Sequence, residues 1–367
     1  MPLFGGKKKE EALVPSKPKI SKYKDYSVPG PTSCLALTNL QGKDAIVASA
    51  LKARGLVAMD VDGEKLWSFD TGATVYSLAI ANLGDTRVVV AGSGGKVFAI
   101  SENGTELWRY SFPATHKAAT KFAGFILEKE KRYGYNDVYH LVAGRLDGED
   151  VIVAIAGLEY SFEGMQIISL QGKEICSLKK AVLGCLFDLS PRGDAILAAL
   201  RAVLSAYKEV SVISKDGEIK NKLKLDIDMA PKDRSNVGGF KDKYRGKLVA
   251  GKLNGVDAVV LGSPETRSVG AASLDGIKLW KYEASPKGEV NAGINDIAIG
   301  SINDQSVVIV GTFDHCVHLI SGDGHRIDAW RYPSNVNNVA YGKIHGRDAI
   351  AVGLYNGEIF TYTMERT

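Results

Sequence analysis

The feature that most constrains the fold of this chain is a phrase that occurs seven times. In each copy an apolar, β-branched run stops at a polar turn rich in Gly or Asp and then starts again. Such a phrase predicts a tight hairpin between two buried strands. The copies read NLQGKDAIVAS, NLGDTRVVVAG, RLDGEDVIVAI, LSPRGDAILAA, KLNGVDAVVLG, SINDQSVVIVG and KIHGRDAIAVG.

The spacing of the copies predicts the repeating unit. With the Leu or Ile before each turn as a marker, the steps are 43, 63, 43, 64, 49 and 42 residues. A basal period of about 42 residues is typical of a four-stranded propeller blade. The markers are Leu40, Leu83, Leu146, Leu189, Leu253, Ile302 and Ile344. We therefore predict an all-β, seven-bladed β-propeller of antiparallel blades, in one domain that spans residues 20–367.

A second phrase, of the form G-x-x-L-W, follows most copies. It reads VDGEKLW, ENGTELW, LDGIKLW and, with two extra residues, GDGHRIDAW. The third repeat has Cys176 at the tryptophan position, and the fourth departs from the pattern after Gly217. We interpret the tryptophans as packing residues between adjacent blades. They are Trp67, Trp108, Trp280 and Trp330.

These phrases resemble those of the quinoprotein-like (PQQ-like) family of β-propellers, whose repeats end in a similar G-x-x-L-W strand. The resemblance covers residues 32–363. The WD40 family is less similar, because the sequence contains no WD dipeptide. The resemblance implies a propeller fold, but a fold of this kind carries many functions.

The two ends of the chain are expected to meet. The seventh repeat has room for only three strands before Thr367, and residues 20–28, ISKYKDYSV, have the Tyr and Val content of a strand. We expect residues 20–28 to supply the outer strand of the last blade, which removes an exposed sheet edge.

Residues 1–19 combine KKKEE with two prolines and predict a flexible basic tail. The segment 194–210 is expected to begin as a strand and to continue as a longer loop, with or without a helical turn.

The net charge of +4 is carried by residues 1–28, which contain seven lysines and three acidic residues. The remaining body is neutral, which argues against nucleic-acid binding through a broad basic patch. No apolar run approaches the roughly 18 residues that cross a bilayer. The four cysteines are far apart and form no CxxC pair. We therefore expect a cytoplasmic protein with neither a zinc site nor a disulfide framework.

The sequence offers little for catalysis. The nearest pair of histidines, His315 and His318, would point to opposite faces of a strand, so a shared metal is not expected. No G-x-S-x-G, GxxxxGK[ST] or HExxH motif occurs. We predict no catalytic residue, no metal and no cofactor. The alternative that the resemblance implies is a quinoprotein-like oxidoreductase, a class that is generally larger, usually eight-bladed and exported.

Extra residues fall in connections that a propeller places on one face. They are the blade-to-blade links 113–137 and 226–246 and the second-to-third strand loops 51–55, 158–164, 201–208 and 264–268. Because loops on a rigid scaffold are where binding residues concentrate, we predict that this face binds the partner. The two links mix basic and aromatic side chains, which suit an acidic protein surface or an RNA segment. The candidate partner-binding residues are His116, Lys117, Lys121, Lys131, Arg132, Tyr133, Tyr135, Arg234, Phe240, Lys241, Lys243, Tyr244 and Arg245.

These observations favour a non-catalytic protein-interaction scaffold, or an adaptor subunit of a larger complex. A further alternative is an RNA-associated or ribosome-associated factor. No small-molecule substrate and no membrane insertion are expected.

Overall fold

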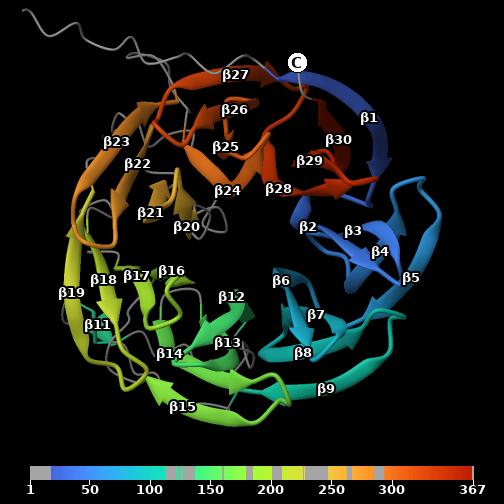
Figure 1. The fold of residues 1–367 in the computed structure, drawn as a ribbon. Coiled ribbons are helices and arrows are strands. Elements are labelled where there is room, and N and C mark those ends of the chain that lie inside the picture. Colours follow the sequence, from blue (N-terminus) through green and yellow to red (C-terminus); the bar gives the residue numbers. More distant parts are fainter. Residues whose placement is uncertain are drawn as a thin grey trace, which may run out of the picture.

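The computed structural model describes residues 18–112, 121–122, 125–126, 137–158, 161–178, 185–200, 209–225, 227, 247–262, 267–284 and 293–365. All regular structure within these residues is β-strand. Seven four-stranded antiparallel sheets stand as blades around a central axis (Figure 1). This confirms the predicted seven-bladed β-propeller.

The strands follow the chain from the axis to the rim in blades one to six. Blade one contains β2 (Thr32–Leu40), β3 (Lys43–Ala50), β4 (Gly55–Asp60) and β5 (Lys65–Asp70), and blade two contains β6 (Val75–Leu83), β7 (Thr86–Ser93), β8 (Lys96–Ser101) and β9 (Glu106–Ser111). Blade three contains β12 (Asp137–Leu146), β13 (Glu149–Leu158), β14 (Ser161–Ser169) and β15 (Glu174–Leu178), and blade four contains β16 (Cys185–Leu189), β17 (Ile196–Leu200), β18 (Glu209–Ile213) and β19 (Ile219–Lys224). Blade five contains β20 (Lys247–Leu253), β21 (Val256–Gly262), β22 (Ser268–Ser273) and β23 (Lys278–Glu283), and blade six contains β24 (Ile294–Ile302), β25 (Gln305–Thr312), β26 (Cys316–Ser321) and β27 (Arg326–Arg331).

Blade seven joins the two ends of the chain. It contains β28 (Val336–Ile344), β29 (Arg347–Leu354), β30 (Glu358–Glu365) and, at the rim, β1 (Lys19–Ser27). β1 runs antiparallel to β30, from Lys19 opposite Glu365 to Ser27 opposite Glu358. The structure thus confirms that an N-terminal strand closes the last blade. A further two-stranded ladder, β10 (Lys121–Phe122) with β11 (Phe125–Ile126), lies in the link between blades two and three.

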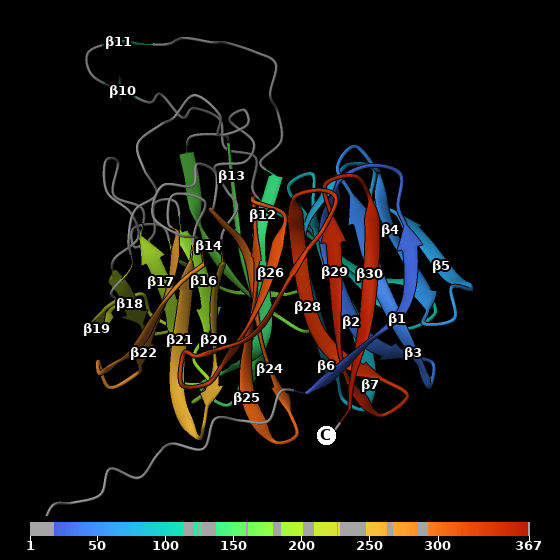
Figure 2. The same ribbon diagram turned by 90° about the horizontal axis from the view of Figure 1, so that it is seen from above.

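The ring has two different faces (Figure 2). The turns between first and second strands and between third and fourth strands lie on one side, here called the turn face. The connections between second and third strands and between blades lie on the other side, here called the loop face. This division follows from the alternating direction of antiparallel strands.

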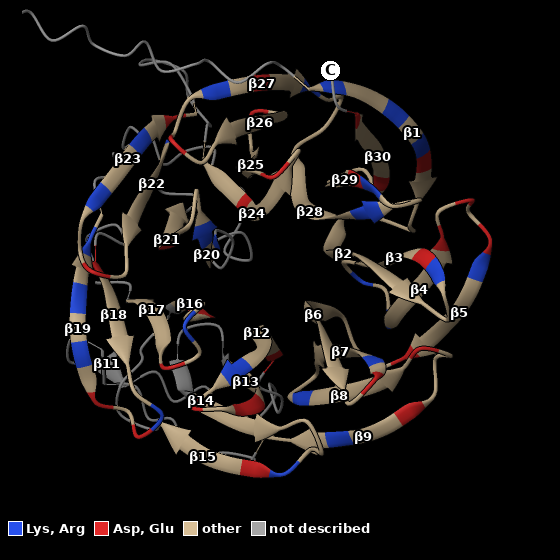
Figure 3. Cartoon of the chain, in the orientation of Figure 1, with Lys and Arg blue, Asp and Glu red and all other residues tan. Residues whose placement is uncertain are grey.

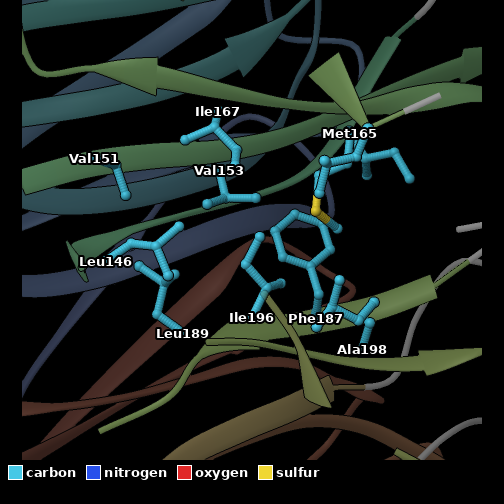
Figure 4. Packing of buried hydrophobic residues seen from close by; sticks show 12 residues of the cluster. Leu146, Val151, Val153, Met165, Ile167, Phe187, Leu189, Ile196 and Ala198 are labelled. Atoms are coloured by element: carbon cyan, nitrogen blue, oxygen red, sulfur yellow. The ribbon is translucent and has the colours of Figure 1, made fainter. Parts of the chain in front are cut away.

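The hydrophobic core is divided into seven clusters, one at each junction between neighbouring blades. At the junction of blades three and four, the fully buried Phe187 of β16 packs near Met165, Ile196 and Ala198 (Figure 4). Each cluster takes residues from two blades. A blade therefore cannot bury its apolar surface alone, and the ring stabilises all of its members together.

One turn differs from the prediction of seven equivalent tight hairpins. In blade one Leu37 pairs with Ile46, but in blade four the marker Leu189 pairs with Ile196, which is the residue equivalent to Ile46. Leu189 is therefore equivalent to Leu37, three residues out of register with the other markers. The reason is Pro191, which has no N–H to donate, so the chain turns through residues 190–195 before the ladder resumes. The strand expected at the start of segment 194–210 is present as β17, and residues 201–208 lie outside the described residues.

Three of the tryptophans bond to the next blade around the ring. Each sits on the outer strand of its blade and donates its ring Nε1–H to a backbone carbonyl that lies two residues before a glycine. The bonds run from Trp67 to Glu102, from Trp108 to Leu170 and from Trp280 to Gly322, with lengths of 2.8, 2.7 and 2.8 Å. The fourth, Trp330, stacks on Tyr362 of blade seven with ring centroids 6.1 Å apart.

The glycine of the repeated phrase is needed for this contact. Gly104 has a φ of +81°, and a Cβ on it would lie 2.7 Å from Cγ of Trp67. Gly172 and Gly324 meet the tryptophan of the preceding blade in the same way, at 2.7 and 2.6 Å. A side chain at these positions would have to displace an indole ring.

Where the ring closes, Tyr26 of β1 makes the hydrogen bond to the next blade that tryptophan makes at three other junctions. Its side chain is buried, and its hydroxyl donates a 2.5 Å hydrogen bond to the carbonyl of Val61, two residues before Gly63. Burial is the main cause that raises the pKa of Tyr26 to about 12, so the hydroxyl keeps its proton. The closing strand therefore forms the same type of junction as the tryptophan-bearing strands.

We predict that Gly104→Ala destabilises the protein more than Gly276→Ala does. Both glycines have a positive φ, +81° and +87°, but a Cβ on Gly276 would meet nothing within 4 Å. Both variants therefore carry similar backbone strain, and the difference between their free energies of unfolding measures the clash with Trp67. Chemical unfolding should show an extra loss of about 1–3 kcal/mol for Gly104→Ala. Equal losses in the two variants would contradict the packing role of the glycine.

Candidate functional site

The first strand of each blade faces the central axis, and five of these strands carry a bulge near their N-terminal end. The bulges interrupt β2, β6, β12, β24 and β28 at the same height. Equivalent residues, matched by their partners on the second strands, form what we call the axial ring, which lies toward the loop face. Its members are Cys34, Ser77, His140, Leu186, Lys247, Asp296 and Asn338.

Most polar members of the axial ring bond to the next blade. Ser77 donates to the carbonyl of Val138 at 3.1 Å, and His140 contacts the carbonyl of Phe187 at 2.7 Å. Because a carbonyl can only accept, Nε2 of His140 carries the proton. Asn338 donates to the carbonyl of Ser33 at 3.4 Å. The bulges thus aim side chains across the junctions.

The charged members of the axial ring lie on blades five and six, and Asp188 of blade four is a partly buried carboxyl near them. Lys247 Nζ lies 3.9 Å from Asp296 Oδ1, and its side chain is 34% exposed against 12% for Asp296. Burial raises the pKa of Asp296, while the positive charge of Lys247 and backbone N–H donors oppose the rise. Burial likewise raises the pKa of Asp188 to about 6, although its carboxylate accepts two backbone N–H bonds. Basic and acidic segments of β20 and β24 face the centre of the ring in Figure 3.

The thiol and the imidazole of the axial ring, Cys34 and His140, are not activated for catalysis. Burial raises the pKa of the Cys34 thiol to about 12, so it stays protonated at neutral pH. Burial, followed by the charge of Lys247, lowers the pKa of His140 to about 3, and its Nε2–H is already bonded. Lys247 is the ring member that can meet a partner, since its side chain is 34% exposed and its one ion pair among the described residues is 3.9 Å long. The arrangement suits binding of a carboxylate or another hydrogen-bond acceptor.

Several buried acceptor atoms near the axial ring have no protein partner among the described residues. They belong to blades one, six and seven, next to the bulges. They are Ser33 Oγ, Asn295 Oδ1, Asn337 Oδ1 and Asn338 Oδ1. A buried polar atom without a hydrogen bond is costly, and a bound water molecule can supply the missing donor at such a position.

The partner-binding residues predicted from sequence lie outside the described residues, except that Lys121 begins β10. What the structure does give is the strands that their links join. Residues 112–136 run from β9 to β12, residues 225–246 run from β19 to β20, and residues 201–208 run from β17 to β18. All of these strand ends lie on the loop face, over blades two to five.

Sequence reasoning missed the axial ring, although a signal for it exists. Six of its seven members lie six residues before a marker Leu or Ile, as Lys247 precedes Leu253 and Asp296 precedes Ile302. An alignment of the seven repeats at the position six residues before the marker shows polar residues in five repeats. Leu186 does not fall at this position, because the marker of blade four is out of register.

The described residues contain neither a large apolar pocket nor a metal cluster that would suggest a small-molecule site. A depression of about 550 Å³ opens on the turn face between blades six and seven. Its charged side chains already pair with each other, Lys343 with Asp348 and Arg347 with Glu365, both at 2.9 Å. No group of three or more His, Cys, Asp or Glu in the described part of the chain could hold a metal ion.

Comparison with known proteins supports the class of the fold. Residues 34–125 match the family described as outer membrane protein assembly factor BamB, a PQQ-type repeat family. No curated protein matches by sequence. The fold is thus that of a seven-bladed β-propeller, and the match over residues 34–125 agrees with the resemblance to PQQ-like repeats that the G-x-x-L-W phrase indicated.

Solved structures of low sequence identity share the fold. The propeller is similar to BBS1N in the crystal structure of its complex with ARL6DN, with a TM-score of 0.66 and 12% identity, over 94% of this chain and 97% of that one. It is also similar to the β-propeller domain of Cps50 (Swd1) from Myceliophteria thermophila, with a TM-score of 0.63 and 13% identity, over 95% of this chain and 100% of that one. At such identities the comparisons establish the fold alone.

We predict that His140 makes the protein less stable as the pH falls. The unfolded chain binds a proton near pH 6.5, whereas folded His140, with its pKa near 3, does not. The stability that the folded chain gains from keeping His140 neutral is therefore complete above pH 6.5 and is lost as the pH falls toward 3. Between pH 7.5 and 5.0 the free energy of unfolding should fall by about 1–2 kcal/mol more in the wild type than in His140→Gln. The Gln variant keeps an N–H donor but does not titrate, so an identical pH dependence would contradict the assignment.

Proposed function

We propose that this protein is a non-catalytic interaction module, a scaffold or adaptor subunit, that binds a protein partner through its loop face. The observation that carries the proposal is the asymmetry of the ring. The long connections join strand ends on one face, and Lys247, whose side chain is 34% exposed, begins β20 at that same face. Loops presented by a rigid scaffold are a common means of recognition.

The charge and hydrogen bonding of the axial ring support a peptide-like partner. Lys247, whose side chain is 34% exposed, offers a donor to a carboxylate. One of the proteins that share the fold, BBS1N, was crystallised in complex with ARL6DN, which shows that a propeller of this kind can bind another protein. Since Cys34 and His140 are not activated, these residues support binding better than catalysis. We propose a cytoplasmic location; no helix in the described residues is long and apolar enough to span a membrane.

The proposal is tested by affinity purification from the native organism. We predict that partners captured by the wild type are lost from a variant lacking residues 117–135 and 232–245 and are reduced with Lys247→Glu. They should be retained by Lys65→Glu, a matched charge reversal on an exposed rim residue of blade one. Circular dichroism and thermal melting confirm that each variant folds.

Other outcomes would point to the alternatives. Partners retained by both loop-face variants would contradict the proposed surface. Co-purifying RNA whose binding weakens steeply with salt would favour an RNA-associated factor. An absorbance band beyond those of protein would favour the quinoprotein-like oxidoreductase, with which the PQQ-type repeats are also compatible.

A further inference from the structure

At one junction of the ring, the turn glycine has no side chain of the preceding blade packed against it. Six turns between third and fourth strands carry a glycine: Gly63, Gly104, Gly172, Gly217, Gly276 and Gly324. In five of them a Cβ on the glycine would meet a side chain of the preceding blade within 3.3 Å. Gly276 of blade five is the exception, with nothing within 4 Å. The space above it is open among the described residues.

The cause lies on the outer strand of blade four. Asn221 pairs with Val212, just as Trp67 pairs with Ala58 and Trp280 pairs with Ala271, so asparagine occupies the tryptophan position. The Oδ1 of Asn221 accepts the backbone N–H of Lys222 at 2.8 Å, which turns the side chain onto its own strand. Asn221 therefore does not replace the missing ring.

Two apolar residues of the strand and the turn that meet at this junction stand where the other repeats are polar. The residue after the turn glycine is Glu64, Thr105, Lys173, Glu218 or His325 in the other turns, but it is Ile277 in blade five. The first residue of the outer strand is charged in blades one, two, three, five and six, but it is Ile219 in blade four. Their exposed fractions are 64% and 47%, among the largest of the apolar side chains described. Ile277 directly follows the open glycine, and Ile219 lies two residues before Asn221 on the neighbouring outer strand, so both belong to the edges of this junction.

The charge of the same strand indicates the chemistry of that partner. β19 carries Lys220, Lys222 and Lys224, all exposed, and no acidic residue. Lys222 lies 3.6 Å from Glu209, which leaves the strand with excess positive charge (Figure 3). An acidic segment complements this edge. The chain's own basic N-terminus, which contains Lys7, Lys8 and Lys9, has the wrong charge to occupy it.

We propose that the rim between blades four and five is a second docking site, for a protein segment in which Trp is flanked by acidic residues. The partner's indole would cover Gly276 between Ile219 and Ile277 and donate its N–H to the carbonyl of Leu274. That carbonyl lies two residues before the glycine, like the acceptors of Trp67, Trp108 and Trp280. The flanking carboxylates would face the lysines of β19. This site lies toward the turn face and is independent of the loop-face proposal.

The first test places an indole at the open junction by a substitution in the chain itself. Asn221→Trp should raise the melting temperature of the full-length protein by about 2 °C or more, because the new ring gains the contacts of the other junctions. Asn221→Ala serves as the control for loss of asparagine and should not be stabilising. A lower melting temperature for Asn221→Trp would show that the position cannot accept an indole and would overturn the proposal.

The second test measures binding by fluorescence anisotropy with a labelled peptide, Glu-Asp-Trp-Asp-Glu, and its matched peptide with Ala at the centre. The wild type should bind the Trp peptide about tenfold more tightly than the Ala peptide, a difference typical of one buried ring. Asn221→Trp and Lys220→Glu should each weaken binding of the Trp peptide about tenfold. Leu107→Trp, which adds an indole to an exposed position of blade two, should leave it unchanged. Equal binding of the two peptides, or full binding by Asn221→Trp, would overturn the proposal.

Discussion

The pairing of β1 with β30 is the constraint on which the rest of the structure depends. Every blade buries its apolar surface against two neighbours, so an open ring would leave two clusters incomplete. The closing strand contributes to both of them, since Ile20 packs in the cluster between blades six and seven and Tyr26 in the cluster between blades seven and one. It also gives β30 a partner, so that this edge is not left free to pair with other chains. Residues more than 300 positions apart thus hold the ring together.

The repeats made the architecture predictable, because the hairpin phrase recurs in each blade and the glycine turn in most of them. Their count, their four strands and the closing segment 20–28 were all within reach of pattern reading. The register of blade four was not, because the marker Leu189 resembles the others while Pro191 lengthens the turn behind it. The role of Tyr26 was also hidden, since it stands outside the G-x-x-L-W phrase and meets Val61 only when the ring closes.

The candidate sites likewise depend partly on sequence patterns and partly on geometry that only the structure shows. The axial ring forms because equivalent residues of the seven inner strands lie at one height, with a bulge in five of these strands. A single residue such as Lys247 does not reveal this until the repeats are aligned. The open rim between blades four and five appears in sequence as a departure from a pattern, with Asn221 in place of tryptophan. Its meaning depends on geometry, because only the structure shows that Gly276 has nothing above it. A repeat protein can thus carry function where one repeat departs from the rest.

The closed ring is tested most directly by comparing the thermal unfolding of two truncated chains. A chain that lacks residues 1–17 keeps β1 and should melt as the full-length protein does. A chain that lacks residues 1–27 loses β1, and with it the ladder to β30 and the Tyr26 hydrogen bond, so its melting temperature should fall by many degrees and its transition should broaden. Identical melting of the two chains would contradict closure by the N-terminal strand.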